Sequence, residues 1–240
     1  MINIDKFKDF IYLVANKSGR GTLTPAQFNT ATERGLYAWT NNQVANQKQF
    51  QPGSPISQTS FEMDAIATEK LRHLKENRDV RVISGKMFLP DGTNTDVNGE
   101  IMPGMWFPSR ISHKYTFKGN IKNPAIEIVK DSEWNLRLGS YIVEPSTGYP
   151  IGNYQSNYLL IAPSSIIITN FVYVRNPTKP VWGYTTTNSR PLYDAATSVD
   201  LDAPESAMNE IAMIVLEFIG IRIREQELVQ AAAGLENKGV

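Results

Sequence analysis

Proline is spread unevenly along the chain, and this distribution constrains the fold more than any other feature of the sequence. The first 50 residues contain a single proline, Pro25, whereas nine prolines lie between residues 103 and 191. Proline removes a backbone donor and disrupts the interior of a helix, so a stretch with many prolines favours strands and turns. We therefore expect helices at the two ends of the chain and a β-rich region between them.

The N-terminal part has the periodicity of amphipathic helices. Apolar side chains recur at helical intervals over residues 3–15, which predicts a first helix. A second helix is expected to begin at Thr24, because Thr24 and Gln27 have the spacing of a capping box. Residues 41–58 are rich in Asn, Gln, Ser and Pro and predict an exposed loop, and a weaker apolar pattern predicts a third helix over residues 61–74.

The middle of the chain changes to the period of two that is typical of strands. Strands are predicted from Val80 onward, and residues 111–117 give the clearest alternation of apolar and polar side chains. Apolar runs predict further strands over 126–129, 158–161 and 166–174. The last of these is expected to be central in its sheet, because both of its faces are apolar.

Two dipeptides in this region, Asp91-Gly92 and Asn98-Gly99, are typical of hairpin turns. Acidic and amide side chains alternate with glycine there, as they do in calcium-binding loops. However, the spacing of Asp91 and Asp96 does not fit the twelve-residue calcium loop. Turns are therefore the favoured interpretation.

The C-terminal part returns to helical spacing. Asp202, Pro204 and Glu205 predict the start of a helix that extends to Gly220. Its side chains are apolar almost all round, so we expect other helices to bury it. A more polar helix is expected over residues 224–235.

These patterns together predict an α+β fold. We expect a helical bundle formed by the N- and C-terminal helices, with a β-rich insertion of sandwich-like or barrel-like form. The expected regions are N-terminal helices over residues 1–78, the β-rich insertion over 79–192, and C-terminal helices over 193–240 that pack back on the first set.

The composition argues against several classes of protein. Lys and Arg number 24 and so do Asp and Glu, which gives no overall charge to attract nucleic acid or an anionic membrane. The chain has no cysteine, which excludes disulfides and thiolate metal sites. No apolar stretch reaches the roughly 18 residues of a membrane span, and the charged N-terminal residues do not have the pattern of a secretory signal.

We expect neither enzymatic activity nor a cofactor or metal. The sequence has two histidines, and His113 lies on the apolar face of a predicted strand, where a hydrogen-bonded core residue is the favoured interpretation. Glu127, Asp131 and Glu133 form the one dense acidic cluster of the β-rich region. Alternate residues of such a cluster do not converge in the way that a glycosidase requires.

The C-terminal segment GIRIREQELVQAAAGLENKGV has the pattern of a contact helix. A thin apolar stripe runs among Arg, Glu and Gln side chains, which suits a helix that lies along a neighbouring subunit, with charges at its rim. A solvated helix packed on its own domain is the alternative. The candidate interface residues are two apolar anchors, Ile221 and Leu228, and four polar residues, Arg222, Arg224, Glu227 and Gln230.

Three sequence runs resemble a known family. They are YDAATSVDLDAPESAMNEIAMIVLEFIGIRIREQELVQAAAGLENKG at residues 193–239, EPSTGYPIGNY at 144–154 and FVYVRNPTKPVW at 171–182. This combination resembles structural proteins of short-tailed bacteriophages, including crAss-like phages, that are similar to head–tail connector or adaptor proteins. Ala203 stands where that family usually has an aromatic residue before the proline.

The resemblance implies a virion structural protein at the head–tail junction, assembled in the host cytoplasm. It implies a closed ring of twelve copies that contacts the portal protein on one side and the next tail or ring protein on the other. DNA would pass through the lumen without sequence-specific binding, and no membrane is involved. A ring also requires two different contact faces on each subunit, and the proline-rich loops 144–150 and 176–180 are candidates for one of them.

A second hypothesis belongs to another class of protein. The β-rich region could recognise a carbohydrate or a receptor of the host through its aromatic side chains, with the helices as an oligomerisation stalk. This hypothesis predicts that Trp106 or Trp182 is exposed in a groove.

Overall fold

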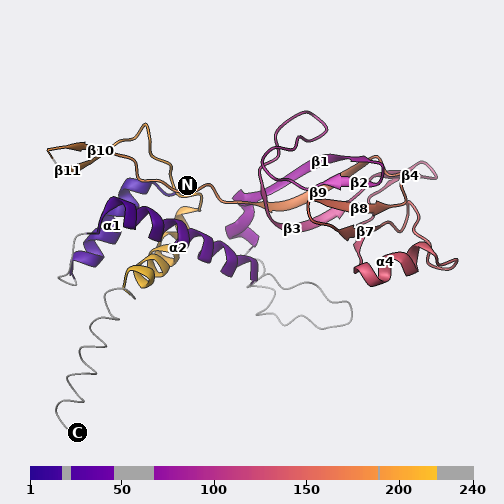
Figure 1. Ribbon diagram of the computed structural model, residues 1–240, viewed down its shortest axis with the longest axis horizontal. Helices are drawn as coiled ribbons and strands as arrows, with labels where there is room; N and C mark the ends of the chain where they lie inside the picture. Colours follow the sequence, from indigo (N-terminus) through magenta and orange to yellow (C-terminus); the bar gives the residue numbers. More distant parts are fainter. Residues whose placement is uncertain (18–22, 46–67, 189, 221–240) are drawn as a thin grey trace, which may run out of the picture. The chain divides into compact units, whose positions relative to one another are not determined.

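The computed structural model describes residues 1–17, 23–45, 68–188 and 190–220, which form a mixed α+β fold (Figure 1). The chain divides into two compact units. The first, here called the helical unit, consists of Met1–His73 and Pro177–Val240, and the second, the sheet unit, consists of Leu74–Asn176. The sequence placed the corresponding boundaries at residues 78/79 and 192/193.

The helical unit contains two long helices near the N-terminus and a third helix before residue 221. Its helices are α1 (Ile4–Lys17), α2 (Pro25–Ala45), a turn of helix at 68–71 with the 3-10 helix η1 (Arg72–Leu74) at the unit boundary, the 3-10 helix η2 (Glu205–Ala207) and a helix over 208–220. Two short strands, β10 (Tyr184–Thr187) and β11 (Arg190–Tyr193), form a hairpin in the same unit.

The first two helices begin close to the residues that the sequence predicts. The backbone N–H of Thr24 donates to Gln27 Oε1 at 3.1 Å, and the N–H of Gln27 donates to Thr24 Oγ1 at 3.3 Å, which is a capping box. One hydrophobic cluster joins α1, α2 and helix 208–220 through side chains that include Phe7, Leu36 and Ile211. Of the helix predicted over 61–74, residues 61–67 lie outside the described residues, and residues 68–74 form the helical turn and η1.

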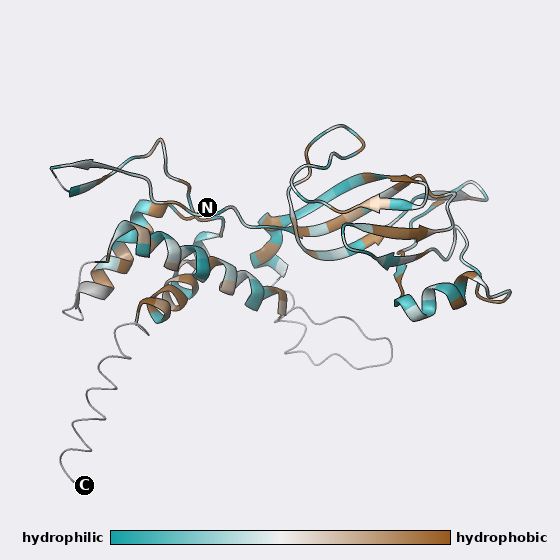
Figure 2. Ribbon diagram, in the orientation of Figure 1, coloured by the Kyte–Doolittle hydropathy of each residue, from teal (hydrophilic) through white to brown (hydrophobic). Residues whose placement is uncertain are grey.

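Close packing between α2 and helix 208–220 depends on a glycine. A Cβ atom at Gly35 would lie 2.4 Å from Cγ2 of Val215, so a larger residue there requires the Val215 side chain or one of the helices to move. The prediction that other helices bury helix 208–220 on all sides is wrong. Ile211 and Val215 are buried, but Met213 is 69% exposed and Phe218, near the end of the helix, is 37% exposed. Figure 2 shows hydrophobic residues recurring along this helix.

The sheet unit is built on one curled seven-stranded sheet in the form of half a barrel (Figure 1). Its strand order is β3-β9-β1-β2-β8-β7-β6. The strands are β1 (Lys75–Ile83), β2 (Lys86–Phe88), β3 (Met105–Ser112), β6 (Glu127–Ile128), β7 (Ile151–Tyr154), β8 (Tyr158–Ala162) and β9 (Ile168–Arg175). A separate hairpin of β4 (Tyr115–Phe117) and β5 (Asn120–Lys122) and the helix α4 (Asp131–Leu138) lie between β3 and β7 in sequence.

Both edges of the large sheet are poor templates for further pairing. The edge strand β3 contains Pro108 and two register shifts, and the opposite edge strand β6 has two residues. Proline, bulges and short length all discourage edge-to-edge association. The 166–174 strand was predicted to be central in its sheet; β9 is paired on both sides, with β3 and β1, and lies next to the edge strand β3.

Two predicted strands differ from those in the structure. The strand predicted from Val80 begins earlier in the structure, at Lys75. The prediction began too late because the first residues of the strand are polar and do not show the apolar alternation. The strand predicted over 111–117 is broken: β3 ends at Ser112, and β4 pairs with β5 instead. Lys118 and Gly119 have positive φ angles of 49° and 77°, which fold the chain back in a tight turn.

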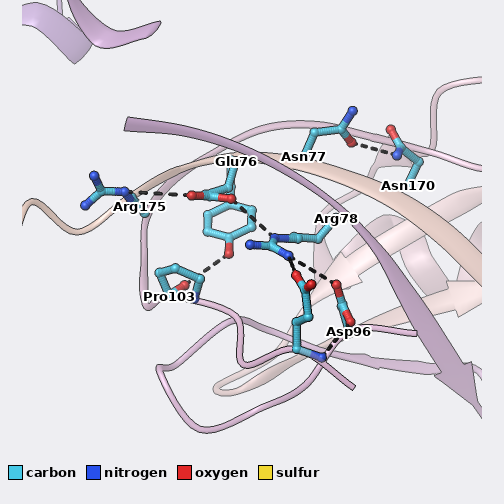
Figure 3. Close-up of polar contacts among 9 residues, drawn as sticks. Glu76, Asn77, Arg78, Asp96, Pro103, Asn170 and Arg175 are labelled. Carbon is cyan, nitrogen blue, oxygen red and sulfur yellow. Dashed lines mark hydrogen bonds and ion pairs between the residues drawn. The ribbon is translucent and has the colours of Figure 1, made fainter. Parts of the chain in front are cut away.

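A polar network holds the 91–104 loop on the sheet (Figure 3). Arg78 on β1 donates to Asp96 Oδ2 at 3.3 Å, to Glu76 Oε2 at 3.3 Å and to Glu100. Asp96 in turn accepts the backbone N–H groups of Asn98 and Glu100. Burial alone raises the pKa of Asp96, but these bonds outweigh it and the pKa falls below its ordinary value.

The predicted turns at Asp91-Gly92 and Asn98-Gly99 lie in this loop. Asp91 Oδ1 accepts the backbone N–H groups of Thr93 and Asn94, and Asn98-Gly99 closes a turn between Thr95 and Ile101, which form a single antiparallel bridge. Asp91 and Asp96 therefore both accept hydrogen bonds from backbone N–H groups of their own loop.

Candidate functional site

The six interface residues predicted from the sequence lie outside the part of the chain that the structure describes. They are Ile221, Arg222, Arg224, Glu227, Leu228 and Gln230, all in the range 221–240. The described residues nevertheless contain three surfaces with the character of contact sites.

The first surface is an exposed apolar run in the sheet unit, residues 136–149, here called the apolar segment. It begins in α4, a helix with no buried residue. Leu136 is 74% exposed, Tyr141 98% and Ile142 92%, and Leu138, Val143 and Tyr149 are exposed as well. Soluble monomers rarely expose large apolar side chains in such a group, so the segment has the composition of an interface.

Polar contacts hold the apolar segment in place without covering it. Asn153 on β7 donates to Asp131 Oδ1 at 2.8 Å and to the Val129 carbonyl at 3.1 Å, which fixes the start of α4. Arg137 pairs with Glu127 at 3.1 Å. At the other end of the segment, the Thr147 carbonyl lies 2.7 Å from Nε2 of His113. The backbone is thus anchored while its apolar side chains face solvent.

The second surface is the β4–β5 hairpin, residues 114–122, here called the basic hairpin. Phe117 is 51% exposed and Ile121 is 73% exposed. Three lysines, Lys114, Lys118 and Lys122, are exposed on it too. The hairpin therefore presents apolar and cationic side chains together.

The third surface is the β10–β11 hairpin of the helical unit, here called the arm. Every residue of both strands is exposed, including Tyr184, Leu192 and Tyr193. A two-stranded hairpin alone is marginally stable in water, so its form depends on the contacts at its base.

Trp182 provides that base. Its ring stacks on Tyr184 at a centroid distance of 5.7 Å and lies 6.0 Å from the ring of Tyr193. Its Nε1 donates to Asp5 Oδ1 at 2.8 Å, and the Lys8 ammonium lies 3.6 Å from its ring centroid. Burial lowers the pKa of Lys8, although nearby aspartates counteract part of this effect. Of the two tryptophans that the carbohydrate hypothesis names, Trp182 is 1% exposed and offers no open stacking face, and Trp106 is half-buried.

One edge of the arm is open to pairing and the other is blocked. The N–H of Asp194 bonds to the Gly183 carbonyl, so by antiparallel alternation Tyr184 and Thr186 direct their backbone groups away from β11. Pro191 is opposite Thr186 and likewise directs its backbone outward, where it has no N–H to donate. The outer edge of β10 carries neither proline nor charge.

The two histidines have structural contacts. His113 is buried, bonds to Thr147 and stacks on Tyr115 at 5.5 Å, as expected of a hydrogen-bonded core residue. His73 Nε2 lies 2.8 Å from the carbonyl of Asp202, whose carboxylate accepts the N–H and hydroxyl of Thr178. Asp202 therefore contacts both His73 and Thr178, the helical-unit residues at or next to the two unit boundaries.

The described ranges contain no group of three or more His, Asp or Glu side chains placed to hold a metal ion. None of the helices in these ranges has the length and apolarity needed to cross a membrane.

The sequence indicated these surfaces only in part. The loop 144–150 was a candidate contact face because of its prolines, and it forms the end of the apolar segment. The arm was missed, although YTTTNSRPLY has a β-branched run followed by a turn pair. The exposure of Tyr141 and Ile142 could not be predicted, because the sequence alone does not show whether an apolar side chain is buried or exposed.

Comparisons with known proteins give no further assignment: no protein-family model and no curated protein sequence matches the chain.

Proposed function

We propose that this protein is a virion structural protein, a subunit of a head–tail adaptor ring that joins the portal to the tail and helps to retain packaged DNA. The observation that carries the proposal is the apolar segment. Its two ends are held by the contact of the Thr147 carbonyl with His113 and by the Arg137–Glu127 ion pair, yet Tyr141 and Ile142 are almost fully exposed. A surface of this kind is suited to permanent burial against another protein chain.

The energy available from such burial favours a repeated contact. Complete burial of one large apolar side chain contributes about 1.5–3 kcal/mol. A single contact of a few such residues is weak after the cost of association, whereas contacts repeated round a closed ring reinforce one another. A structural ring is therefore a better use of the apolar segment than a transient encounter.

A cyclic ring needs two different faces on each subunit. The apolar segment provides one, and the basic hairpin and the arm are separate candidates for the other. In the finer form of the proposal, the N- and C-terminal helices form a bundle that supports the ring, with twelve copies as the family resemblance implies. Residues 221–230 are proposed to contact the portal.

The charge distribution is compatible with passage of DNA. The chain has 24 basic and 24 acidic residues, so a ring built from it has no net charge and no overall electrostatic attraction for DNA. The proposal includes no catalytic step, no cofactor and no membrane contact.

Substitution of Leu136 and Ile142 by serine tests the proposal. Because both side chains are exposed, L136S/I142S is expected to leave the thermal midpoint unchanged within about 2 °C and to weaken self-association about tenfold or more. Sedimentation velocity over a concentration series measures the effect. The matched control is Ile101→Ser, another exposed isoleucine of the sheet unit, which should assemble normally. Unchanged assembly of the double variant would contradict the proposal.

A further inference from the structure

Charge in the sheet unit is divided between two neighbouring parts of the chain. Residues 113–126 contain Lys114, Lys118 and Lys122 and no Asp or Glu, which gives a formal charge of +3. Residues 127–149 contain four carboxylates and two cations, which gives 2 − 4 = −2. The four carboxylates are Glu127, Asp131, Glu133 and Glu144, and the cations are Lys130 and Arg137. The basic hairpin is thus followed in sequence by an acidic stretch, residues 127–149, which includes α4 and the apolar segment.

These charges do not neutralise each other within one copy. Arg137 pairs with Glu127, but none of the hairpin lysines forms an ion pair with a carboxylate in the described ranges. Lys118 instead lies with its ammonium 5.5 Å from the centroid of the Phe117 ring. Glu133 and Glu144 likewise form no ion pair with a cation in the parts of the chain described here.

The apolar side chains are arranged in the same way. Phe117 and Ile121 are exposed on the basic hairpin, and Leu136, Tyr141 and Ile142 are exposed on the apolar segment. Apolar side chains surrounded by charges are the usual composition of a protein–protein interface. Each surface therefore has the chemistry that would cover the other.

One copy cannot bring about this match by itself. His113 and Thr147 are already hydrogen-bonded, so the base of the hairpin and the end of the segment are in contact. Even so, the apolar side chains of both remain exposed. A second copy can supply the matching surface that the first copy leaves uncovered.

We propose that the basic hairpin of one copy docks on the apolar segment of the next copy of this chain. Lys118 and Lys122 face the carboxylates Glu133 and Glu144, while Phe117 and Ile121 pack on the exposed apolar side chains. This contact is heterologous, since the two surfaces differ, and it can therefore repeat round a ring. It rests on the proposed function in that it names the subunit contact of the ring.

The experiment is a charge exchange across the contact, with sedimentation velocity and negative-stain electron microscopy of the full-length protein. K118E/K122E and E133K/E144K are each expected to weaken self-association at least about tenfold, because like charges then face each other. The variant with all four substitutions restores opposite charges and is expected to recover assembly. The matched control for K118E/K122E is R81E/R110E, which makes the same change in net charge as K118E/K122E at exposed arginines elsewhere on the sheet.

Each outcome bears on a distinct statement. If the four-fold variant assembles no better than either double variant, or if the double variants assemble like the wild type, the contact is overturned and a ring held by other surfaces remains. If the wild type stops at two copies that K118E/K122E dissociates, the ring is overturned and the contact stands. If K118E/K122E loses binding to a duplex DNA oligonucleotide but keeps its assembly, the lysines serve DNA and the contact is overturned.

Discussion

At the scale of single residues, stability depends on a few charged side chains that connect distant parts of the sequence. Arg78 is the most connected of those in the sheet unit. It bonds to Glu76 on its own strand and to Asp96 and Glu100 in the following loop, while Arg175 on β9 approaches Glu76 at 3.8 Å (Figure 3). Tyr173 lies beside this network, and burial raises its pKa to about 12.

Replacement of Arg78 by methionine keeps the apolar stem and removes the charge. The side chain of Asp96 is then left buried with fewer partners, so R78M is expected to destabilise the protein by about 2 kcal/mol. Urea unfolding followed by circular dichroism measures the change. R81M, on the same strand but exposed, is the control and should lie within about 0.5 kcal/mol of the wild type. Equal stability of the two variants would contradict the role of Arg78.

Glu210 has a similar role in the helical unit. It accepts hydrogen bonds from Trp39 Nε1 at 2.9 Å and from Lys70 at 2.5 Å. Burial alone raises the pKa of Glu210, but these bonds outweigh it, so the pKa falls below its ordinary value of 4.5. The folded state therefore holds this proton less tightly than the unfolded state does.

The sign of the pH effect follows from that difference. The contribution of Glu210 is present above pH 4.5 and is lost as the pH falls through the lower pKa of the folded state. E210Q should be less stable than the wild type at pH 7, and the difference should shrink below pH 4. Thermal midpoints of both proteins across this range provide the measurement, with E217Q on the same helix as control. A constant difference between pH 7 and pH 3 would contradict the assignment.

At the scale of secondary-structure elements, the arm shows how hydrogen-bond direction decides tolerance to substitution. Thr186 directs its N–H outward and Thr185 directs its N–H toward β11. T186P is therefore expected to keep the hairpin, whereas T185P should open it. Amide hydrogen exchange at Leu192, which is paired with Thr185, should stay slow in T186P and become fast in T185P. Equal exchange in the two variants would contradict this alternation.

The elements differ in how far the sequence predicts them, for physical reasons. α1 and α2 were predicted because a one-sided apolar stripe and a capping box are local features. The start of β1 was missed because Lys75 to Asp79 are polar, and that part of the strand is specified by long-range pairing with β9. The exposed side of helix 208–220 was missed because an apolar residue such as Met213 has the same sequence pattern whether it is buried or exposed.

At the scale of the whole molecule, the sequence predicts the alternation of helical and β-rich parts better than the contact surfaces. The division into two units follows from where the core side chains lie: one cluster contains Phe7 and Trp182, and another contains Val80 and Phe171. Contact surfaces depend instead on what remains uncovered. The sequence located its interface in residues 221–230, whereas the described residues add the apolar segment, the basic hairpin and the arm.

These three surfaces give the account its central claim, which is that the chain is a subunit of a closed ring. In a monomer, the side chains of Tyr141 and Ile142 would stay exposed to water. A ring would bury this segment once per subunit, and the portal would add a second layer of contacts through the residues after Gly220.

Native mass measurement of the purified protein, alone and mixed with the portal protein of the same virus, tests this claim most directly. The account predicts one closed species that binds the portal, with the twelve copies that the family resemblance implies. A chain that ends at Gly220 should still form this species and should lose the portal. A protein that stays monomeric at every concentration, both alone and with the portal, would contradict the account.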